Sequence, residues 1–159
     1  MFSWTMKTIR RVLNRKQLRL KDRDYSRDGA YFVTFIVQDR IKSFGVVVDG
    51  RMELSKYGKI ADQQFEWLQN QYPYINIPVW IVMPDHIHAI IEIIRTWSGQ
   101  DLNNQLIKVK SLPELIGAYK TTTSKQIHIS GLPGFRWQRS YHDHIIRNNI
   151  EYSHIYNYI

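Results

Sequence analysis

The stretch VWIVMPDHIHAIIEI, residues 79–93, has the pattern of two strands joined by a tight turn. Pro84-Asp85 supplies turn residues between the two apolar runs, and such residues favour an antiparallel connection. Because side chains on a strand alternate between the two faces of a sheet, we expect His86 and His88 to point the same way and Ile87 the opposite way. The stretch therefore predicts two imidazoles side by side on one face of an antiparallel sheet.

Outward from this stretch, the spacing of apolar residues predicts the other elements. The expected strands are, in chain order, 29–40, a hairpin over 43–54 that turns at Asp49-Gly50, 75–84, 86–94 and an extended segment within 131–147. The expected helices are 55–71, 111–130 and 148–159. Residues 95–112 are polar and lack sustained periodicity, so a loop is expected there.

The order of these elements predicts the fold class. The stripes expected to share a face are Leu115, Ile116, Tyr119 and Ile127 in the second helix, and Ile150, Ile155 and Tyr158 in the last. The elements follow the order strand, hairpin, helix, strand, strand, helix, strand and helix, which is the order of an α+β fold. We expect a ferredoxin-like sandwich, an antiparallel sheet with helices packed on one face.

Composition predicts one domain preceded by a basic arm. The chain has 159 residues and no cysteine, which excludes disulfides, zinc–thiolate sites and a thiol nucleophile. Its net charge is +8, and residues 1–27 hold nine Lys or Arg against two Asp, whereas 28–159 are nearly neutral. A basic arm suits a polyphosphate partner, although a solvated tail that keeps the protein soluble has the same composition. We expect a basic N-terminal arm at 1–27 and a single domain at 28–159.

No membrane segment is predicted. The longest apolar candidate, 77–94, is interrupted by Asp85, His86, His88 and Glu92. The first residues, MFSWTMKTIRR, lack the hydrophobic segment of a secretory signal. We therefore expect a cytoplasmic protein with no membrane partner.

The paired histidines suggest a metal site. Two neutral imidazoles at same-face positions of a rigid strand can bind one divalent cation together. A third ligand must then come from elsewhere, and open positions must remain for substrate oxygens. The alternative is that His86 and His88 are structural and hydrogen bond to backbone or water.

Five blocks in order carry a family resemblance: GAYFVTF (29–35), ELSKYG (53–58), VWIVMPDHIHAII (79–91), FRWQRSYHDHIIRN (135–148) and YNYI (156–159). Their order and spacing resemble the single-tyrosine HUH transposase family, which includes insertion-sequence enzymes and the REP-associated tyrosine transposases. The resemblance covers about residues 24–159, and it implies that 28–159 is one HUH-type catalytic domain. It also implies an enzyme that cuts and rejoins single-stranded or hairpin DNA through a 5′-phosphotyrosine intermediate, with Mg²⁺ or Mn²⁺ as cofactor.

The resemblance also assigns residues. His86 and His88 match the metal-binding pair of the HUH motif, and Tyr158 in YNYI matches the tyrosine nucleophile. The competing tyrosines are Tyr141, Tyr152 and Tyr156.

A third metal ligand is expected one helical turn after the tyrosine. The family usually supplies an Asn or Gln there, and in this sequence that position would follow Ile159. We interpret the chain either as a C-terminally truncated version or as one in which another residue completes the coordination. The expectation is weak metal binding and little cleavage, even where DNA binding is retained.

The segment 135–148 combines arginines with aromatic rings, as single-stranded nucleic-acid sites do. The residues expected to bind DNA are Arg136, Trp137, Arg139 and Arg147, with Lys120 and Lys125 on the second helix. A core role for Trp137 and an ordinary solvated helix face for the lysines are the structural alternatives. Insertion-sequence members of the family tend to be dimers, whereas REP-associated members look monomeric. The resemblance therefore does not decide between a monomer and a homodimer.

Two other functions fit the same residues. A non-catalytic module of this fold would bind single-stranded or hairpin nucleic acid, and its affinity would fall steeply with salt. A metal-dependent hydrolase of a small substrate could use His86 and His88, but no Ser or Cys elbow accompanies them.

Overall fold

The computed structural model describes residues 28–94 and 108–159, so the predicted arm 1–27 and most of the predicted loop lie outside the described residues. A four-stranded antiparallel sheet has the order β4-β5-β1-β6. Its strands are β1 (Gly29–Ile36), β4 (Ile75–Val82), β5 (His86–Ile93) and β6 (His142–Ile146). The helices are α1 (Lys56–Gln71), α2 (Leu112–Ile129) and α3 (Asn149–Tyr158). This order of strands and helices confirms the α+β, ferredoxin-like prediction.

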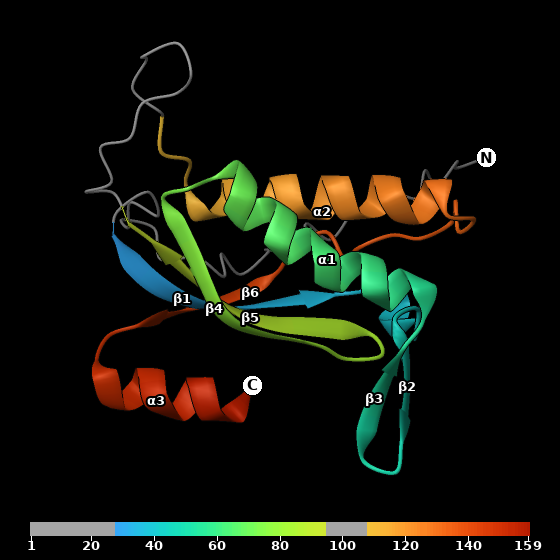
Figure 1. Ribbon diagram of the computed structural model, residues 1–159, viewed down its shortest axis with the longest axis horizontal. Helices are drawn as coiled ribbons and strands as arrows, with labels where there is room; N and C mark the ends of the chain where they lie inside the picture. The colour runs from blue at the N-terminus through green and yellow to red at the C-terminus, as the bar shows by residue number, and fades with distance from the viewer. Residues whose placement is uncertain (1–27, 95–107) are drawn as a thin grey trace, which may run out of the picture.

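The helices α1 and α2 cover one face of the sheet, here called the helix face (Figure 1). Ser55 caps α1 by accepting hydrogen bonds from the backbone N–H groups of Tyr57 and Gly58, and Ser111 and Glu114 form a capping box at α2. Both helices bury apolar residues against alternate side chains of the strands. The predicted stripe of α2 is confirmed: Leu115, Ile116, Tyr119 and Ile127 are all buried.

Stacked aromatic rings form the centre of the helix face. Phe35 of β1 lies 5.2 Å from Tyr119 of α2 between ring centroids, and Tyr119 lies 4.4 Å from Phe65 of α1. All three side chains are fully buried. Burial of large rings contributes strongly to stability, so this cluster joins both helices to the sheet.

The third helix lies on the opposite face of the sheet (Figure 1). Prediction and structure therefore agree for α1 and α2 and differ for α3. The shared face expected for Ile150, Ile155 and Tyr158 is not buried: α3 has no buried residue, and Ile150 and Tyr158 are 72% and 71% exposed. Because α3 has no second helix to pack against, Ile150 faces solvent and Ile155 is only half-buried, while Tyr158 keeps one side of its ring against the sheet.

A small hairpin separates β1 from α1. Its strands are β2 (Gly45–Val48) and β3 (Arg51–Leu54), as predicted, and Figure 1 shows it extending away from the sheet on the side of α3. Asp49 and Gly50 have φ angles of 48° and 75°, which is the left-handed pair that a two-residue type I′ turn requires. The valines of β2 are exposed.

The first strand ends earlier than its sequence predicts. The sequence predicts a strand as far as residue 40, but β1 stops at Ile36 and is followed by the short 3-10 helix η1 (Gln38–Arg40). Asp39 and Arg40 have φ angles of 57° and 55°, in the left-handed region, so the chain cannot continue as a strand through them.

The edge strand β4 is irregular. Its pairing with β5 shifts register between Asn76 and Val79, and Pro78 between them has no N–H to donate. The N–H of the neighbouring Ile77 donates a hydrogen bond of 2.8 Å to the Gln69 side chain of α1. This part of the edge therefore presents few free donors.

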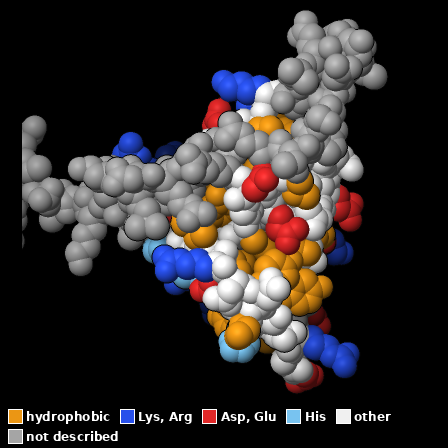
Figure 2. All heavy atoms as spheres, turned by 90° about the vertical axis from the view of Figure 1, so that its left-hand side faces the viewer, with side chains coloured by type: hydrophobic (Ala, Val, Ile, Leu, Met, Phe, Trp, Pro, Cys, Tyr) orange, Lys and Arg blue, Asp and Glu red, His pale blue; other side chains and the backbone are white. Residues whose placement is uncertain are grey.

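No helix among residues 28–94 and 108–159 is long and apolar enough to cross a membrane. Figure 2 shows the end of the molecule that lies at the left of Figure 1, with both acidic and basic side chains beside hydrophobic ones. That mixture fits the near-neutral charge balance of residues 28–159.

Candidate active site

The two histidines lie on the sheet face opposite α1 and α2, here called the histidine face. In the register of β1 with β5, Thr34 lies opposite His88 and Ile36 opposite His86. The two imidazole centroids are 4.8 Å apart, while Ile87 between them is fully buried on the helix face. Strand alternation therefore places the rings as the sequence predicts.

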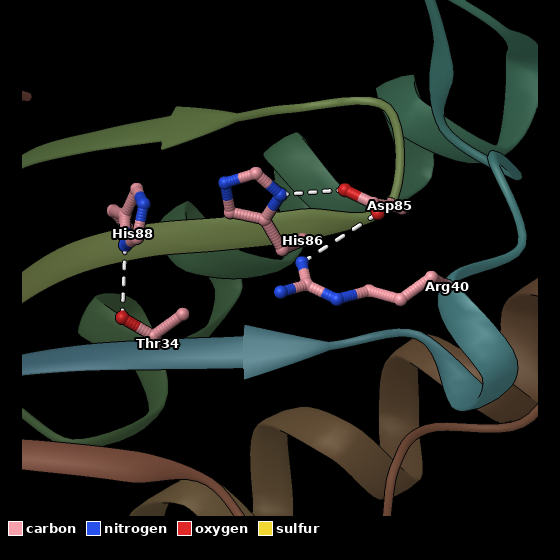
Figure 3. Close-up of polar contacts among 5 residues, drawn as sticks. All are labelled: Thr34, Arg40, Asp85, His86 and His88. Carbon is pink, nitrogen blue, oxygen red and sulfur yellow. Dashed lines mark hydrogen bonds and ion pairs between the residues drawn. The ribbon is translucent and has the colours of Figure 1, made fainter.

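Each imidazole is held through Nδ1 (Figure 3). His86 Nδ1 lies 2.6 Å from the Asp85 carboxylate, and His88 Nδ1 lies 2.9 Å from the Thr34 hydroxyl. The second carboxylate oxygen of Asp85 lies 3.5 Å from the guanidinium of Arg40. Hydrogen bonds at Nδ1 fix the orientation of an imidazole and leave Nε2, on the other side of the ring, as its ligand atom.

The environment keeps His88 neutral. Burial, together with smaller contributions from the neighbouring His86 and Arg40, lowers its pKa to about 4. A neutral imidazole is the form that binds a metal ion. The charge state of His88 near neutral pH therefore suits the role that the motif predicts.

Tyr158 of α3 lies beside His88. Their ring centroids are 5.8 Å apart, and Phe32 of β1 lies 5.3 Å from His88 and 6.4 Å from Tyr158. The hydroxyl-bearing ring of Tyr158 is largely exposed, so an external substrate can reach it. The structure thus brings Tyr158, His86 and His88 to one place on the histidine face.

Polar contacts fasten α3 to the sheet. The hydroxyl of Tyr152 donates a hydrogen bond of 2.7 Å to Glu92 of β5. At the start of the helix, Asn148 caps the N–H of Glu151, whose carboxylate lies 2.5 Å from His144 Nε2 of β6 and accepts from the N–H of Arg147. The hydrogen bonds from the Arg147 N–H and from His144 lower the pKa of Glu151. Because α3 buries nothing, its position depends on such contacts.

The competing tyrosines lie elsewhere. Tyr141 is only 7% exposed and belongs to the core. Tyr152 uses its hydroxyl to hold α3, and burial together with the Glu92 hydrogen bond raises its pKa to about 12. Tyr156 stacks on Tyr152 at 6.2 Å between centroids. Of the four tyrosines considered, Tyr158 is the one with a ring contact to the histidine pair.

Two of the residues expected to bind DNA have structural partners on the helix face. Trp137 packs among Phe35, Phe44 and Tyr119 and donates from Nε1 to the carbonyl of Lys120 at 3.2 Å. The ammonium of Lys120 donates to the carbonyls of Gln138 and Ser140, and burial lowers its pKa to about 8. Both side chains hold the segment before β6 in place.

The remaining residues expected to bind DNA are exposed, and they are dispersed: Arg136, Arg139, Arg147 and Lys125. Arg136 and Arg139 belong to the segment that leads into β6, and Arg147 follows β6 at the start of α3. Lys125 lies on α2, in the layer that covers the helix face, and so on the other side of the sheet from the histidines. The structure does not gather these residues into one patch around the histidine pair.

The described part of the chain contains no group of three or more His, Cys, Asp or Glu side chains that could hold a metal ion. The histidine pair nevertheless fits two positions of a metal site, since both rings are oriented through Nδ1 and His88 is neutral. His86 and His88 could therefore supply two of the ligands of a divalent cation.

Sequence reasoning missed the residues that support the histidines. The sequence places Asp85 only in the turn, although a carboxylate is a common orienting partner of a metal-binding histidine and this one directly precedes His86. Thr34 and Arg40 lie far from His86 in sequence, and only the pairing of β1 with β5 and the turn after β1 bring them there.

Comparisons with known proteins agree with the motifs. No protein-family model matches the chain. A Haemophilus influenzae protein described as uncharacterized is 28% identical over 157 residues, covering 93% of this chain and 87% of that protein. A second Haemophilus influenzae protein, named "Putative REP-associated tyrosine transposase", is 25% identical over 140 residues, covering 86% of this chain and 71% of that protein.

A solved structure of a REP-associated tyrosine transposase bound to a REP hairpin matches the fold with a TM-score of 0.59 and 20% identity. The match covers 89% of this chain and 70% of that chain. The chain is therefore similar in sequence to a protein named as a REP-associated tyrosine transposase and has the fold of a solved one, in agreement with the resemblance carried by its motifs.

Proposed function

We propose that the chain is a transposase-like enzyme that binds single-stranded DNA beside a hairpin and cleaves it with Tyr158. The observation that carries the proposal is the position of Tyr158, whose ring lies 5.8 Å from His88 on the face where His86 and His88 project together. The sequence relative with a transposase name supports it, as does the fold shared with a transposase that binds a REP hairpin. A DNA substrate also agrees with the expected cytoplasmic location.

The proposed reaction is a phosphoryl transfer to Tyr158. Its phenol oxygen attacks the phosphorus of a phosphodiester, the bond from phosphorus to the 3′ oxygen breaks, and the phenol proton is balanced by the proton that the departing 3′-OH takes up. The 5′-phosphate then remains on the tyrosine oxygen. Because a phosphodiester is exchanged for a phosphodiester, the step is reversible and a second DNA end can be joined.

In this proposal His86 and His88 would hold Mg²⁺ or Mn²⁺. The cation, when bound, withdraws charge from the phosphate oxygens. Asp85 and Thr34 orient the two imidazoles, and burial keeps His88 in the neutral form that a ligand needs. The exposed arginines Arg136, Arg139 and Arg147 supply charge for phosphates further along the strand.

The second candidate is a DNA-binding module without cleavage. The finding that favours it is that residues 28–94 and 108–159 gather no three-ligand acidic or histidine cluster. Such a module would bind hairpin or single-stranded DNA with steep salt dependence, and its affinity would not change with metal or with Tyr158→Phe.

The test is a denaturing gel with the full chain, Mn²⁺ and hairpins flanked by randomised single strands. The DNA is labelled at its 3′ end, because the proposed adduct retains the 5′-phosphate side of the break. Because two imidazoles alone should bind the cation weakly, we expect a labelled adduct in low yield, which disappears in Tyr158→Phe and persists in the matched control Tyr156→Phe. DNA binding without any adduct would support the second candidate, and an adduct that survives in Tyr158→Phe would contradict the assignment of the nucleophile.

A further inference from the structure

The turn after β1 has an unusual backbone beside the histidine pair. Asp39 and Arg40 are consecutive non-glycine residues with φ angles of 57° and 55°. Such residues rarely adopt this conformation, and where they do the surrounding structure holds them and a binding site is frequently near. Here the flanking backbone is fixed by hydrogen bonds from Val37 N–H to the Asp85 carbonyl and from Gln38 N–H to the Arg136 carbonyl, both 2.9 Å.

A pocket of about 260 Å³ opens beside this turn, here called the turn pocket. Its walls come from the segment that starts at Val37 and from the loop before β6, with Ile41, Leu132 and Phe135 among the apolar members. Asp39 and Arg136 add one charge of each sign. Pockets for drug-sized ligands measure about 300–1,000 Å³, so this one suits a smaller group.

The same turn also reaches the histidine pair. Arg40, between the lining residues Asp39 and Ile41, extends its guanidinium to within 3.5 Å of the Asp85 carboxylate that orients His86. Figure 3 shows Arg40 running beneath His86 from the turn. Its side chain is 60% exposed, so a phosphate can approach it from solvent. One short segment therefore supplies a pocket wall and a cation next to the proposed phosphate site.

We propose that the turn pocket binds the base of an unpaired nucleotide whose phosphate lies at Arg40. This inference rests on the proposed function, which places single-stranded DNA at the histidines. Apolar walls suit the faces of a base, and guanidinium groups suit phosphate oxygens. The Asp39 carboxylate accepts hydrogen bonds from exocyclic amino groups, so cytosine, adenine or guanine should bind more tightly than thymine.

Gly134 offers a way to close the pocket without disturbing the core. It lines the turn pocket, and a Cβ placed on it meets no heavy atom within 4 Å. Gly134→Leu should therefore fold, and its larger side chain at the wall should narrow the turn pocket. Gly117 on α2 is also open to an added Cβ, and it does not line this pocket, so Gly117→Leu is the matched control.

The experiment is titration of the ¹⁵N-labelled full chain with deoxynucleoside 5′-monophosphates, followed by NMR. We expect dCMP, dAMP or dGMP to shift amide signals of 38–43 and 132–136, and 2-deoxyribose 5-phosphate to shift them much less. Gly134→Leu should weaken binding at least about tenfold, which corresponds to about 1.4 kcal/mol. Gly117→Leu should bind as the wild type does. No shift in these two segments, or equal binding by Gly134→Leu, would overturn the proposal.

The proposed position of the phosphate at Arg40 is tested separately. In the wild type, the monophosphate should bind more tightly than the matching deoxynucleoside, and Arg40→Gln should remove that difference while leaving nucleoside binding intact. A difference that persists in Arg40→Gln would show that the phosphate lies elsewhere and overturn this part. If Tyr158 forms an adduct with DNA but no mononucleotide binds at the turn pocket, this inference alone is overturned. If mononucleotides bind at the turn pocket but no adduct forms, only the proposed cleavage is overturned.

Discussion

The two faces of the sheet differ in how they use their side chains. On the helix face, Phe35, Phe65 and Tyr119 are fully buried and stack between two capped helices. On the histidine face, His86 and His88 are only half-buried, and the covering helix α3 buries no residue. Within β5, Ile87 and Ala89 are fully buried on the helix face, whereas His86 and His88, which alternate with them, project on the histidine face. This separation lets the site change while the core remains intact.

The largest expected effect comes from removing a ring of the helix face. Phe35→Ala should lower the free energy of unfolding by about 3–5 kcal/mol, because it leaves a cavity among packed aromatic rings. Phe32→Ala, on the same strand but on the histidine face, should cost less than half as much because its site is open. Urea denaturation measures both, and equal losses would break the contrast between the faces.

A substitution behind the histidines should affect metal binding rather than stability. Thr34→Val keeps the shape of the side chain and removes the hydroxyl that lies 2.9 Å from His88 Nδ1. Loss of such an orienting partner typically weakens metal binding about 10–100-fold. Titration with Mn²⁺, followed by the EPR signal of the free ion, measures the change, with the exposed Thr121→Val as control. Unchanged Mn²⁺ affinity would argue against a metal-binding role for His88.

The attachment of α3 should be separable from global unfolding. Asn148→Ala removes the cap on the Glu151 N–H, and a lost cap costs a helix about 1 kcal/mol. We expect amide hydrogen exchange in α3 to become about fivefold faster while the amides of β1 keep their protection. If β1 exchanged faster by the same factor, α3 would be part of the cooperative core.

The smallest effect should be a dependence of α3 on acid. Hydrogen bonds from the Arg147 N–H and from His144 lower the pKa of Glu151. The stabilisation that the Glu151 carboxylate gives to α3 is therefore complete above the ordinary glutamate pKa of about 4.3. It is lost as the pH falls through the lowered pKa of Glu151 in the folded protein. Exchange of α3 amides should therefore accelerate in that acidic range after correction for the intrinsic rate. Glu151→Gln should be insensitive there, and an identical acid response in this variant would assign the effect to another group.

Much of this fold could be predicted from local sequence signals. Asp49-Gly50 specified a hairpin because both residues tolerate positive φ, and the alternation through His86, Ile87 and His88 specified which side chains share a face. The α2 stripe was predictable because its helical spacing coincides with real burial. In each case the signal and its structural consequence lie within a few residues of each other.

The position of α3 and the support of the histidines could not be predicted in this way. The apolar spacing of Ile150 and Ile155 suggested a packed helix, but α3 is held by polar contacts from Glu92 and His144, which come from two other strands. Thr34 meets His88 only through the register of β1 with β5. Contacts of this kind form only when strands distant in sequence are brought together, so the spacing of residues along the chain does not predict them.

The irregular edge of β4 limits how copies of this protein can meet. Joining two sheets edge to edge needs a row of outward N–H and C=O groups, and here Pro78 interrupts that row while Gln69 of α1 occupies the N–H of Ile77. A continuous intermolecular sheet through β4 is therefore disfavoured, which also protects the protein from aggregation by strand addition. A homodimer that extends the sheet would need a strand edge other than that of β4.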